Sequence, residues 1–367
     1  MDKMTIFKTI GALVAAGALS FVLTPVVKRI AHKIGAIDVP KDNRRMHKVP
    51  IPRLGGLAVF FGFLVSVLAL LPIDTEMRGI LIGSVVIVVL GVIDDSVSLS
   101  PLVKLFVQIG AALIVVFHGV RIDVLSNINV LSDTAYIGLG GWSVPVTVIW
   151  IVAITNAVNL IDGLDGLSVG VCTIASLSML VISAIVSEYT IMLVMAALAG
   201  ACIGFLPYNL NPAKIFVGDT GATFLGFMLA SMSIQGMFKT YAILSFAVPF
   251  LVLGLPIFDT VFAIFRRIAH GQSPMQADRG HVHHRLIDMG FSQKQSVLIL
   301  YLVSGILGTA AVLLTSSGAV RALLFVITVI IAVAIGLRVY IGLSKHEAEK
   351  KEKKKNSEEQ PNRKETN

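Results

Sequence analysis

The chain has 367 residues, of which 55% are hydrophobic and only 14% are charged, with a mean hydropathy of +0.85 and a formal net charge of +8. Soluble domains carry about 25% charged residues, so this composition excludes a soluble globular protein and predicts one that resides in a lipid bilayer. The two cysteines, Cys172 and Cys202, lie within apolar runs, so no disulfide framework is expected.

Apolar runs long enough to cross about 30 Å of hydrocarbon follow one another along the chain. We therefore predict an all-α, polytopic membrane bundle of about 11 transmembrane helices, with Gly, Pro and polar residues at the joins. The first run lacks a small-residue cleavage site and is too long for a signal-peptide core, so we expect it to be retained. The runs cover residues 5–27, 54–72, 79–93, 102–117, 144–158, 167–186, 190–206, 221–237, 241–264, 295–314 and 320–342.

The C-terminal tail differs in composition from the rest of the chain. Residues 345–367 are dense in charge and show no apolar periodicity, which predicts a disordered segment. No internal repeat is evident. The sequence therefore predicts one multi-pass transmembrane domain over residues 1–344, followed by this charged tail.

The distribution of lysine and arginine predicts the orientation in the membrane. The joins after the first and ninth runs and the tail are rich in these residues, whereas the alternate joins carry few. Basic residues are enriched in cytoplasmic loops. We therefore expect the N-terminus outside, and the odd-numbered joins and the C-terminus in the cytoplasm.

The polar clusters between the runs all fall on the side predicted to be cytoplasmic. They follow the first, third, fifth, seventh and ninth runs, at residues 28–53, 91–104, 156–166, 208–221 and 266–285. A random scatter of clusters over the joins would not produce such one-sidedness. The sequence therefore predicts a polar site at the cytoplasmic surface of the membrane.

Asp94 and Asp95 end an apolar run. Burying a carboxylate at the centre of a membrane helix costs roughly 2.5–3.5 kcal/mol, so these acids either reach water or neutralise a cation. The helix macrodipole disfavours anions at a C-terminus, which favours a cationic partner, either Lys104 or a bound divalent metal. A plain helix end at the interface is the alternative.

Asp162 and Asp165 follow Asn159 after the fifth run. The three residues share one face if the helix continues, whereas Gly163 and Gly166 indicate a break at which the backbone approaches a ligand. The spacing excludes an EF-hand, and oxygen-only ligands suit Mg²⁺ or Mn²⁺ better than zinc. A solvated turn at the interface remains an alternative.

Asp219 lies between glycines directly before the eighth run. An acid in this position is typical of a helix cap, and it is also a candidate metal ligand; the two roles are compatible.

The segment "HVHHR" contains His281, His283, His284 and Arg285. It is a candidate zinc site, a site for phosphate and sugar hydroxyls, or a solvated loop. Acids and a basic cluster on one membrane face fit phosphoryl transfer, in which a metal clamps a diphosphate and cations neutralise the developing charge. The position of the site indicates that one substrate is a lipid.

At these positions the chain resembles the polyprenyl-phosphate N-acetylhexosamine-1-phosphate transferases. The resemblance runs over residues 24–342. Each motif alone is weak evidence for the family, but six motifs in the family's order make the resemblance specific. "HVHHR" is similar to the branch that uses UDP-GlcNAc, whereas the branch that transfers phospho-MurNAc-pentapeptide usually carries three consecutive histidines. The motifs are "RRMHKVPIPRLGG", "GVIDDSVSLSPLVKLFVQ", "NAVNLIDGLDGL", "YNLNPAKIFVGDTG", "PIFDTVFAIFRR" and "HVHHRL".

The resemblance implies a bacterial plasma-membrane enzyme that transfers GlcNAc-1-phosphate from UDP-GlcNAc to undecaprenyl phosphate. The products are undecaprenyl-diphosphate-GlcNAc and UMP, in the first membrane step of a teichoic acid-like polymer. It also implies Mg²⁺ as cofactor, with Mn²⁺ as an alternative, and no nucleic-acid partner; a homodimer is left open. The alternatives are a phospho-MurNAc-pentapeptide transferase of peptidoglycan synthesis and a secondary transporter, which would place its charges near the bilayer midplane.

The resemblance also implies roles for individual residues. Asn159 and Asp219 would hold Mg²⁺, and either Asp94 or Asp95 would deprotonate or orient the lipid phosphate, with which Lys104 would pair. The first-loop motif is one residue longer than the family pattern between its acid and its histidine. The residues implied in substrate binding are Asn43, Arg45, Asp162, Asp165, Asn209, His281, His283, His284 and Arg285.

Overall fold

A computed structural model describes residues 2–40, 49–126, 136–235, 247–271 and 280–316, together with Val326 and Ile330. Four of the predicted features lie wholly or largely outside the described residues. These are the last apolar run at 320–342, the tail at 345–367, and the candidate substrate contacts Asn43 and Arg45.

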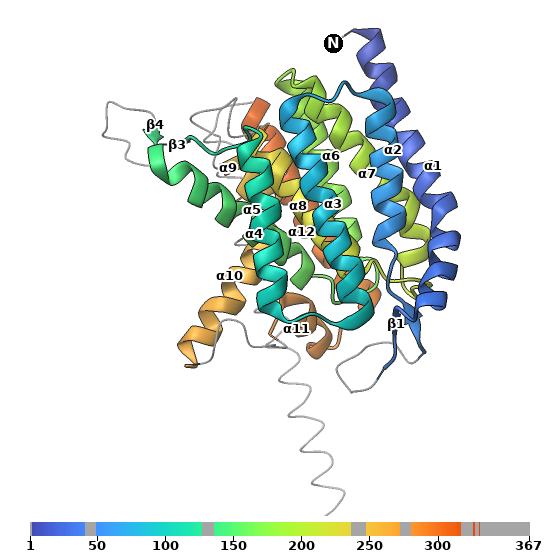
Figure 1. The fold of residues 1–367 in the computed structure, drawn as a ribbon. Coiled ribbons are helices and arrows are strands. Elements are labelled where there is room, and N and C mark those ends of the chain that lie inside the picture. The colour runs from blue at the N-terminus through green and yellow to red at the C-terminus, as the bar shows by residue number, and fades with distance from the viewer. Residues whose placement is uncertain are drawn as a thin grey trace, which may run out of the picture.

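The described chain is a bundle of α-helices with two short β-ribbons (Figure 1). In the part of the chain that is described, six helices are long and apolar enough to cross a membrane, namely α1, α3, α5, α6, α7 and α12, and α2 and α4 are shorter apolar helices. The prediction of an all-α polytopic membrane protein is confirmed. The helices are α1 (Lys3–Ile34), α2 (Gly56–Leu70), α3 (Thr75–Val97), α4 (Pro101–Phe117), α5 (Ser143–Leu160), α6 (Leu167–Ile185), α7 (Tyr189–Asn209), α8 (Gly218–Ser233), α9 (Ala247–Val252), α10 (Gly254–Ala269), α11 (Val282–Asp288) and α12 (Gln293–Ser316).

Polar residues at the joins begin the helices. The Asp74 carboxylate accepts a hydrogen bond of 2.7 Å from the Met77 N–H in the first turn of α3. Ser100 caps α4 in the same way, and Pro101 occupies the first helical position, where its missing N–H costs nothing. The short ribbons pair β1 (Ile37–Asp38) with β2 (Ile51–Pro52), and β3 (Val124–Ser126) with β4 (Tyr136–Gly138).

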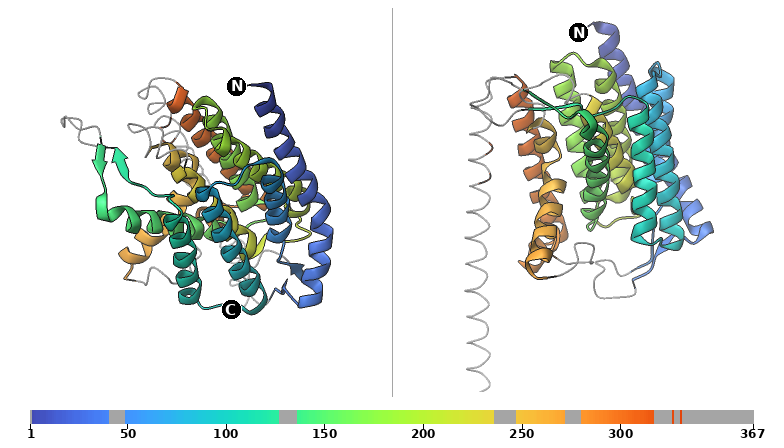
Figure 2. Two further views of the ribbon diagram at one scale, coloured as in Figure 1. Left: turned by 45° about the horizontal axis from the view of Figure 1, so that its top comes forward. Right: turned by 60° about the vertical axis from the view of Figure 1, so that its left-hand side comes forward.

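Small residues allow the outer helices to pack closely. A Cβ atom on Gly200 of α7 would lie 2.0 Å from the Leu13 carbonyl oxygen of α1, so no larger residue fits. Such close approach is typical of helix packing in membranes, where van der Waals contact replaces the hydrophobic effect. Helix α8 is buried along nearly its whole length in the middle of the bundle, in contact with α2, α3 and α5 (Figure 2).

Within the described residues 247–264, the apolar run predicted at 241–264 is not one continuous helix. The chain forms α9 and then α10, with a break at Leu253. Pro256 lacks the N–H that would bond to the Val252 carbonyl, which favours the break here, although α1 and α7 continue through Pro25 and Pro207. Helix α10 then projects away from the bundle (Figure 1).

One end of the bundle collects the functional segments. The C-terminal ends of α3 and α5 lie beside the N-terminal ends of α4 and α8, on the side opposite the N-terminus of α1 (Figures 1 and 2). The β1–β2 ribbon and α11 lie at this same end. The polar clusters that are separate in the sequence are therefore neighbours in space.

Candidate active site

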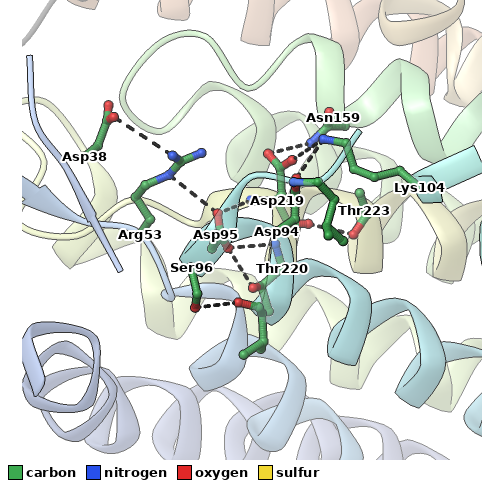
Figure 3. Close-up of polar contacts among 12 residues, drawn as sticks. Asp38, Arg53, Asp94, Asp95, Ser96, Lys104, Asn159, Asp219, Thr220 and Thr223 are labelled. Carbon is green, nitrogen blue, oxygen red and sulfur yellow. Dashed lines mark hydrogen bonds and ion pairs between the residues drawn. The ribbon is translucent and has the colours of Figure 1, made fainter. Parts of the chain in front are cut away.

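Asp95 holds the N-terminus of α8 against α3. Its side chain is almost fully buried, and Oδ1 accepts a hydrogen bond of 3.0 Å from the Asp219 N–H. Its Oδ2 accepts bonds of 3.0 Å from the Thr220 N–H and 2.7 Å from the Thr220 hydroxyl (Figure 3). These N–H groups have no partner within their own helix. The expectation that Asp219 caps α8 is wrong, because Asp95 from another helix satisfies the helix terminus.

The Asp219 side chain is therefore free to face the ends of α4 and α5. Lys104 Nζ lies 2.9 Å from Asp219 Oδ2 and 2.7 Å from Asp94 Oδ2, so one ammonium group bridges two carboxylates. Asn159 Nδ2 donates to Asp219 Oδ1 at 3.1 Å. Asp94 is buried, and its Oδ1 accepts from the Leu99 N–H at 2.7 Å. Side chains from four helices meet at this point (Figure 3).

The donor set fits a magnesium ion that is shared with a substrate. Mg²⁺ is usually bound through one or two carboxylates together with waters and substrate phosphates, and Asn159 and Asp219 supply oxygen ligands of this kind. The bridging position of Lys104 indicates that the two carboxylates around it require a cation. Across the described residues, no group of three or more His, Cys, Asp or Glu is arranged to enclose a metal, which also leaves the zinc alternative for "HVHHR" without support.

A second polar pair, which the sequence analysis missed, lies about one helical turn further along α4 and α5, towards the middle of the bundle. Gln108 on α4 is buried, and its Oε1 accepts a hydrogen bond of 2.6 Å from Asn156 Nδ2 on α5. Gln108 follows Lys104 by four residues and Asn156 precedes Asn159 by three, so both pairs lie on the same helix faces. The pair thus fixes the register of α4 against α5. The signal in the sequence was a glutamine inside an apolar run.

Arg53 is the second residue that the sequence analysis did not single out. It follows β2, and its Nε lies 3.5 Å from Asp95 Oδ1, with Nη1 4.0 Å from Asp38 Oδ1. The segment is held by backbone bonds to the chain before α8, including Phe216 N–H to the Pro52 carbonyl at 2.8 Å. Gly218 has φ +70°, and a Cβ atom there would collide with the Arg53 carbonyl, so only glycine fits.

A polar cavity of ≈ 270 Å³ opens beside Asp219. Asp94, Asp95 and Lys104 are not among its lining residues and lie behind Asp219. The lining combines residues from the first loop, the α5–α6 turn, the segment before α8 and the start of α11. The residues are Asp38, Arg53, Asn159, Asp162, Gly163, Leu164, Asp165, Asn209, Phe216, Gly218, Asp219, His284 and Gln293.

The turn between α5 and α6 is a break in the helix, as one of the two alternatives predicted. Asp162 lies in this turn and accepts a hydrogen bond of 2.5 Å from Ser168 Oγ. Removal from water, together with the nearby carboxylates, raises the pKa of Asp162 to about 7. Asp165 Oδ2 instead accepts from Asn211 Nδ2 at 2.9 Å and from the Ala213 N–H at 3.0 Å, so this acid anchors the loop before α8.

Asn209, at the end of α7, lies against the same cavity. Its Nδ2 donates to the Ile215 carbonyl at 3.1 Å, which ties the loop before α8 to α7. Its buried Oδ1 has no hydrogen-bond partner within the described part of the chain. Buried acceptors are normally satisfied, so this atom is available to a donor on a bound molecule.

The "HVHHR" segment is divided between the cavity and the interior. His284 lines the cavity, whereas His281 and His283 are only 5% and 3% exposed. The rings of His281 and His283 are stacked with centroids 5.8 Å apart, and His284 follows at 4.3 Å from His283. Burial lowers the pKa of His283 to about 3, so this ring is neutral at pH 7. Arg285 lies over the Phe262 ring at 4.9 Å and does not line the cavity.

Comparison with known proteins agrees with the motif resemblance. A model of glycosyl transferase family 4 matches residues 77–237. The chain is 43% identical over 297 residues to a probable undecaprenyl-phosphate N-acetylglucosaminyl 1-phosphate transferase of Bacillus subtilis, which covers 81% of this chain and 82% of the relative. It is 36% identical over 336 residues to a decaprenyl-phosphate N-acetylglucosaminephosphotransferase of Mycobacterium tuberculosis, covering 81% of this chain and 80% of the relative.

A third relative extends the similarity to another bacterial lineage. This is an undecaprenyl-phosphate alpha-N-acetylglucosaminyl 1-phosphate transferase of Thermotoga maritima, 33% identical over 267 residues that cover 72% of this chain and 78% of the relative. Because the similarity extends over most of each chain, this protein belongs to glycosyl transferase family 4, among the polyprenyl-phosphate GlcNAc-1-phosphate transferases, and is a membrane sugar-1-phosphate transferase.

Proposed function

We propose that this enzyme transfers GlcNAc-1-phosphate from UDP-GlcNAc to undecaprenyl phosphate. An oxygen of the lipid phosphate forms a bond to the sugar-bearing phosphorus, and the bond from that phosphorus to the bridging oxygen of the diphosphate breaks. UMP leaves with that oxygen, and the lipid retains the diphosphate and the sugar. The substrates named for the relatives are polyprenyl phosphates that receive an N-acetylglucosaminyl 1-phosphate group, which supports this assignment.

The observation that carries the proposal is the meeting of Asp94, Lys104, Asn159 and Asp219 at one end of the bundle, beside a polar cavity. Phosphoryl transfer requires mainly positioning and neutralisation of charge, and this arrangement supplies both. Its location at the end of apolar helices supports a site that a lipid head group and a water-soluble nucleotide would both reach.

Lys104 is the residue proposed to receive the lipid phosphate. It lies in the first turn of α4, and its neighbours Leu102, Val103 and Phe106 are exposed on the outer, apolar face of the bundle. A lipid whose chain lies along this face would bring its phosphate to the ammonium group. Charge-assisted bonds of this kind are about twice as strong as neutral ones.

Of the two adjacent acids, Asp94 is the better candidate for orienting or deprotonating the lipid phosphate. It bonds directly to Lys104 at 2.7 Å, whereas both oxygens of Asp95 accept bonds from the N-terminus of α8. Asp95 therefore acts on the reaction through the position of Asp219. A covalent phosphosugar intermediate on one of these acids is not required by the proposal.

Asn159 and Asp219 would hold Mg²⁺, or Mn²⁺ in its place. When bound, the ion draws negative charge from the diphosphate and so makes its phosphorus easier to attack. Arg53 lines the cavity and lies near the carboxylates of Asp38 and Asp95, and its guanidinium is a suitable second cation for the diphosphate.

The remaining cavity residues are proposed to recognise the nucleotide sugar. Asp162 and Asp165 line the cavity and are assigned to the nucleotide, and the unpaired Oδ1 of Asn209 is available to a donor of the substrate. His284 is the histidine that lines the cavity and is proposed to contact the sugar phosphate. His281, His283 and Arg285 contribute from behind it.

The proposed setting is the plasma membrane of a bacterium, with the site facing the cytoplasm. About 11 spans, an outside N-terminus and a cytoplasmic tail at 345–367 complete the arrangement, with residues 1–344 as the catalytic domain. The basic joins at the site end support this orientation. The lipid-linked GlcNAc product would begin a teichoic acid-like surface polymer.

Purified protein in detergent, with Mg²⁺ and undecaprenyl phosphate, tests the proposal against a panel of UDP-GlcNAc, a second UDP-N-acetylhexosamine and UDP-MurNAc-pentapeptide. We expect UMP release and a lipid product with the mass of undecaprenyl-diphosphate-GlcNAc from the first of these alone. A MurNAc-pentapeptide product would identify the peptidoglycan enzyme, and absence of UMP release with every donor is the result expected of a transporter. Asp94→Asn and Asp219→Asn should abolish UMP release, while Ser96→Ala, an exposed neighbour, should not.

A further inference from the structure

Helix α10 carries a buried carboxylate that contacts the "HVHHR" segment at two points. Asp259 is 3% exposed, and its Oδ2 lies 2.8 Å from His281 Nδ1. Its Oδ1 accepts a hydrogen bond of 2.7 Å from the N–H of Val282, the first residue of α11. The two carboxylate oxygens thus contact the residue before α11 and the first residue of α11.

This contact determines which ring nitrogen of His281 carries a proton. A carboxylate accepts hydrogen bonds and does not donate them, so Nδ1 must be the protonated nitrogen. The other carboxylate oxygen, Oδ1, accepts from the Val282 N–H. This N–H has no partner inside α11, because the first N–H groups of a helix are unpaired, and the side chain of the N-cap residue His281 does not bond to it. One acid therefore fixes both the ring and the start of the helix.

The same face of α10 makes two further contacts with the segment. Arg266 Nη1 donates to the Gly280 carbonyl at 2.6 Å, and a Cβ atom on Gly280 would collide with the Arg266 guanidinium. Phe262 lies under the Arg285 guanidinium at 4.9 Å. Asp259, Phe262 and Arg266 are spaced by three and four residues, which places them on one face of the helix. Helix α10 thus holds the segment 280–285 through the side chains of this face.

The contacts then continue from α11 to the cavity. The His281 ring stacks on His283, which in turn lies against His284. His283 also packs against the α5–α6 turn, where a Cβ atom on Gly163 would lie 2.2 Å from its Nε2. His284 is the only one of the three rings that lines the cavity within the described part of the chain. Its position therefore depends on α11, and the position of α11 depends on Asp259.

We propose that Asp259 is a positioning residue for the nucleotide sugar: it holds His281 and the first turn of α11 so that His284 faces the cavity. The inference rests on the proposed function, since it assigns His284 to the nucleotide-sugar side of that site. Asp94, Lys104 and the exposed face of α4 belong to other helices. Loss of Asp259 should consequently affect the KM for UDP-GlcNAc much more than the KM for the lipid.

The test measures KM for each substrate with the purified full-length enzyme. Asp259→Ala should raise the KM for UDP-GlcNAc about tenfold or more, because a displacement of about 1 Å at a positioning group can cost that much, while the KM for undecaprenyl phosphate stays within about twofold. His281→Ala should raise the same KM, and the double variant should be no worse than Asp259→Ala alone, since His281→Ala removes one of the two contacts that Asp259 makes. Asp288→Asn, an exposed acid at the end of α11, is the matched control and should match the wild type.

Two conservative variants keep the inference testable if Asp259→Ala does not fold. His281→Asn places an amide N–H close to the position of Nδ1 and should retain most of the affinity, whereas His281→Gln should not. Asp259→Asn preserves the bond to Val282, and its amide N–H can donate to Nδ1 of the other neutral tautomer of His281, so it should also retain most of the affinity. An unchanged KM for UDP-GlcNAc in folded His281→Gln, or equal rises for both substrates, would overturn the inference. Absence of UMP release by the wild-type protein would instead overturn the proposed function.

Discussion

Replacement of Asp95 by alanine removes the acceptor of three hydrogen bonds at the N-terminus of α8. Removal of a helix cap typically costs about 1 kcal/mol, and the buried Thr220 hydroxyl would also lose its acceptor, which costs about a further 1–3 kcal/mol. We therefore expect the free energy of unfolding to fall by about 3 kcal/mol. Activity should fall with it, because Asp219 lies in the same first turn.

Thermal unfolding of the detergent-purified variants, followed by the loss of the monodisperse species, measures this effect. Ser96→Ala is the matched control, since Ser96 is exposed and bonds only to the carbonyl of its own helix at Val92. It should stay within about 0.5 kcal/mol of the wild type. An Asp95→Ala protein with wild-type thermal stability and no activity would refute the reasoning, because it would show that Asp95 acts on the substrate and not on α8.

Gly163→Ala should raise the KM for UDP-GlcNAc, because its Cβ would collide with the buried His283 ring. Gly110→Ala is the control: a Cβ there has no atom within 4 Å, so kcat and KM should stay unchanged. Equal effects of the two substitutions would contradict the packing described. Burial raises the pKa of Asp162 to about 7, so between about pH 4 and pH 7 the folded protein keeps a proton on this carboxyl that the unfolded chain has lost. The free energy of unfolding should therefore fall as the pH rises through this range and then level off. Asp162→Asn should remove that slope in chemical or thermal unfolding, and a persistent slope would assign it to another group. Chelation of divalent ions should stop UMP release by the wild type, and added Mg²⁺ should restore it, whereas added Mg²⁺ should not restore release in Asp219→Asn. UMP release that is insensitive to chelation would remove the ion from the proposal.

The sequence predicted most of the helices because the signal for each is local. An apolar run of membrane length forms a helix wherever it lies in the chain, since the bilayer leaves the backbone no other partner. The run at 167–186 corresponds to α6, and the run at 190–206 corresponds to α7, within a few residues. The run at 241–264 was predicted as one continuous helix because hydropathy does not register the missing N–H of Pro256.

The candidate site was only partly predictable. Asp94, Asn159 and Asp219 were recognisable, because polar residues at the ends of apolar runs are costly and therefore informative. Gln108 lay inside a run and Asp259 near the end of one, and neither was singled out. Their partners, Asn156 and His281, come from other helices, so no spacing along the chain links the members of each pair.

The sequence by itself determined that the protein is a membrane helical bundle and that its polar clusters follow alternate runs, since hydrophobic length and charge act locally. Only the tertiary structure decided how adjacent or similar residues divide their tasks. Asp94 meets Lys104, whereas Asp95 holds α8, and His284 reaches the cavity, whereas His281 is buried against α10. Successive residues of a helix point about 100° apart, so which neighbour each one meets depends on how distant helices pack around it.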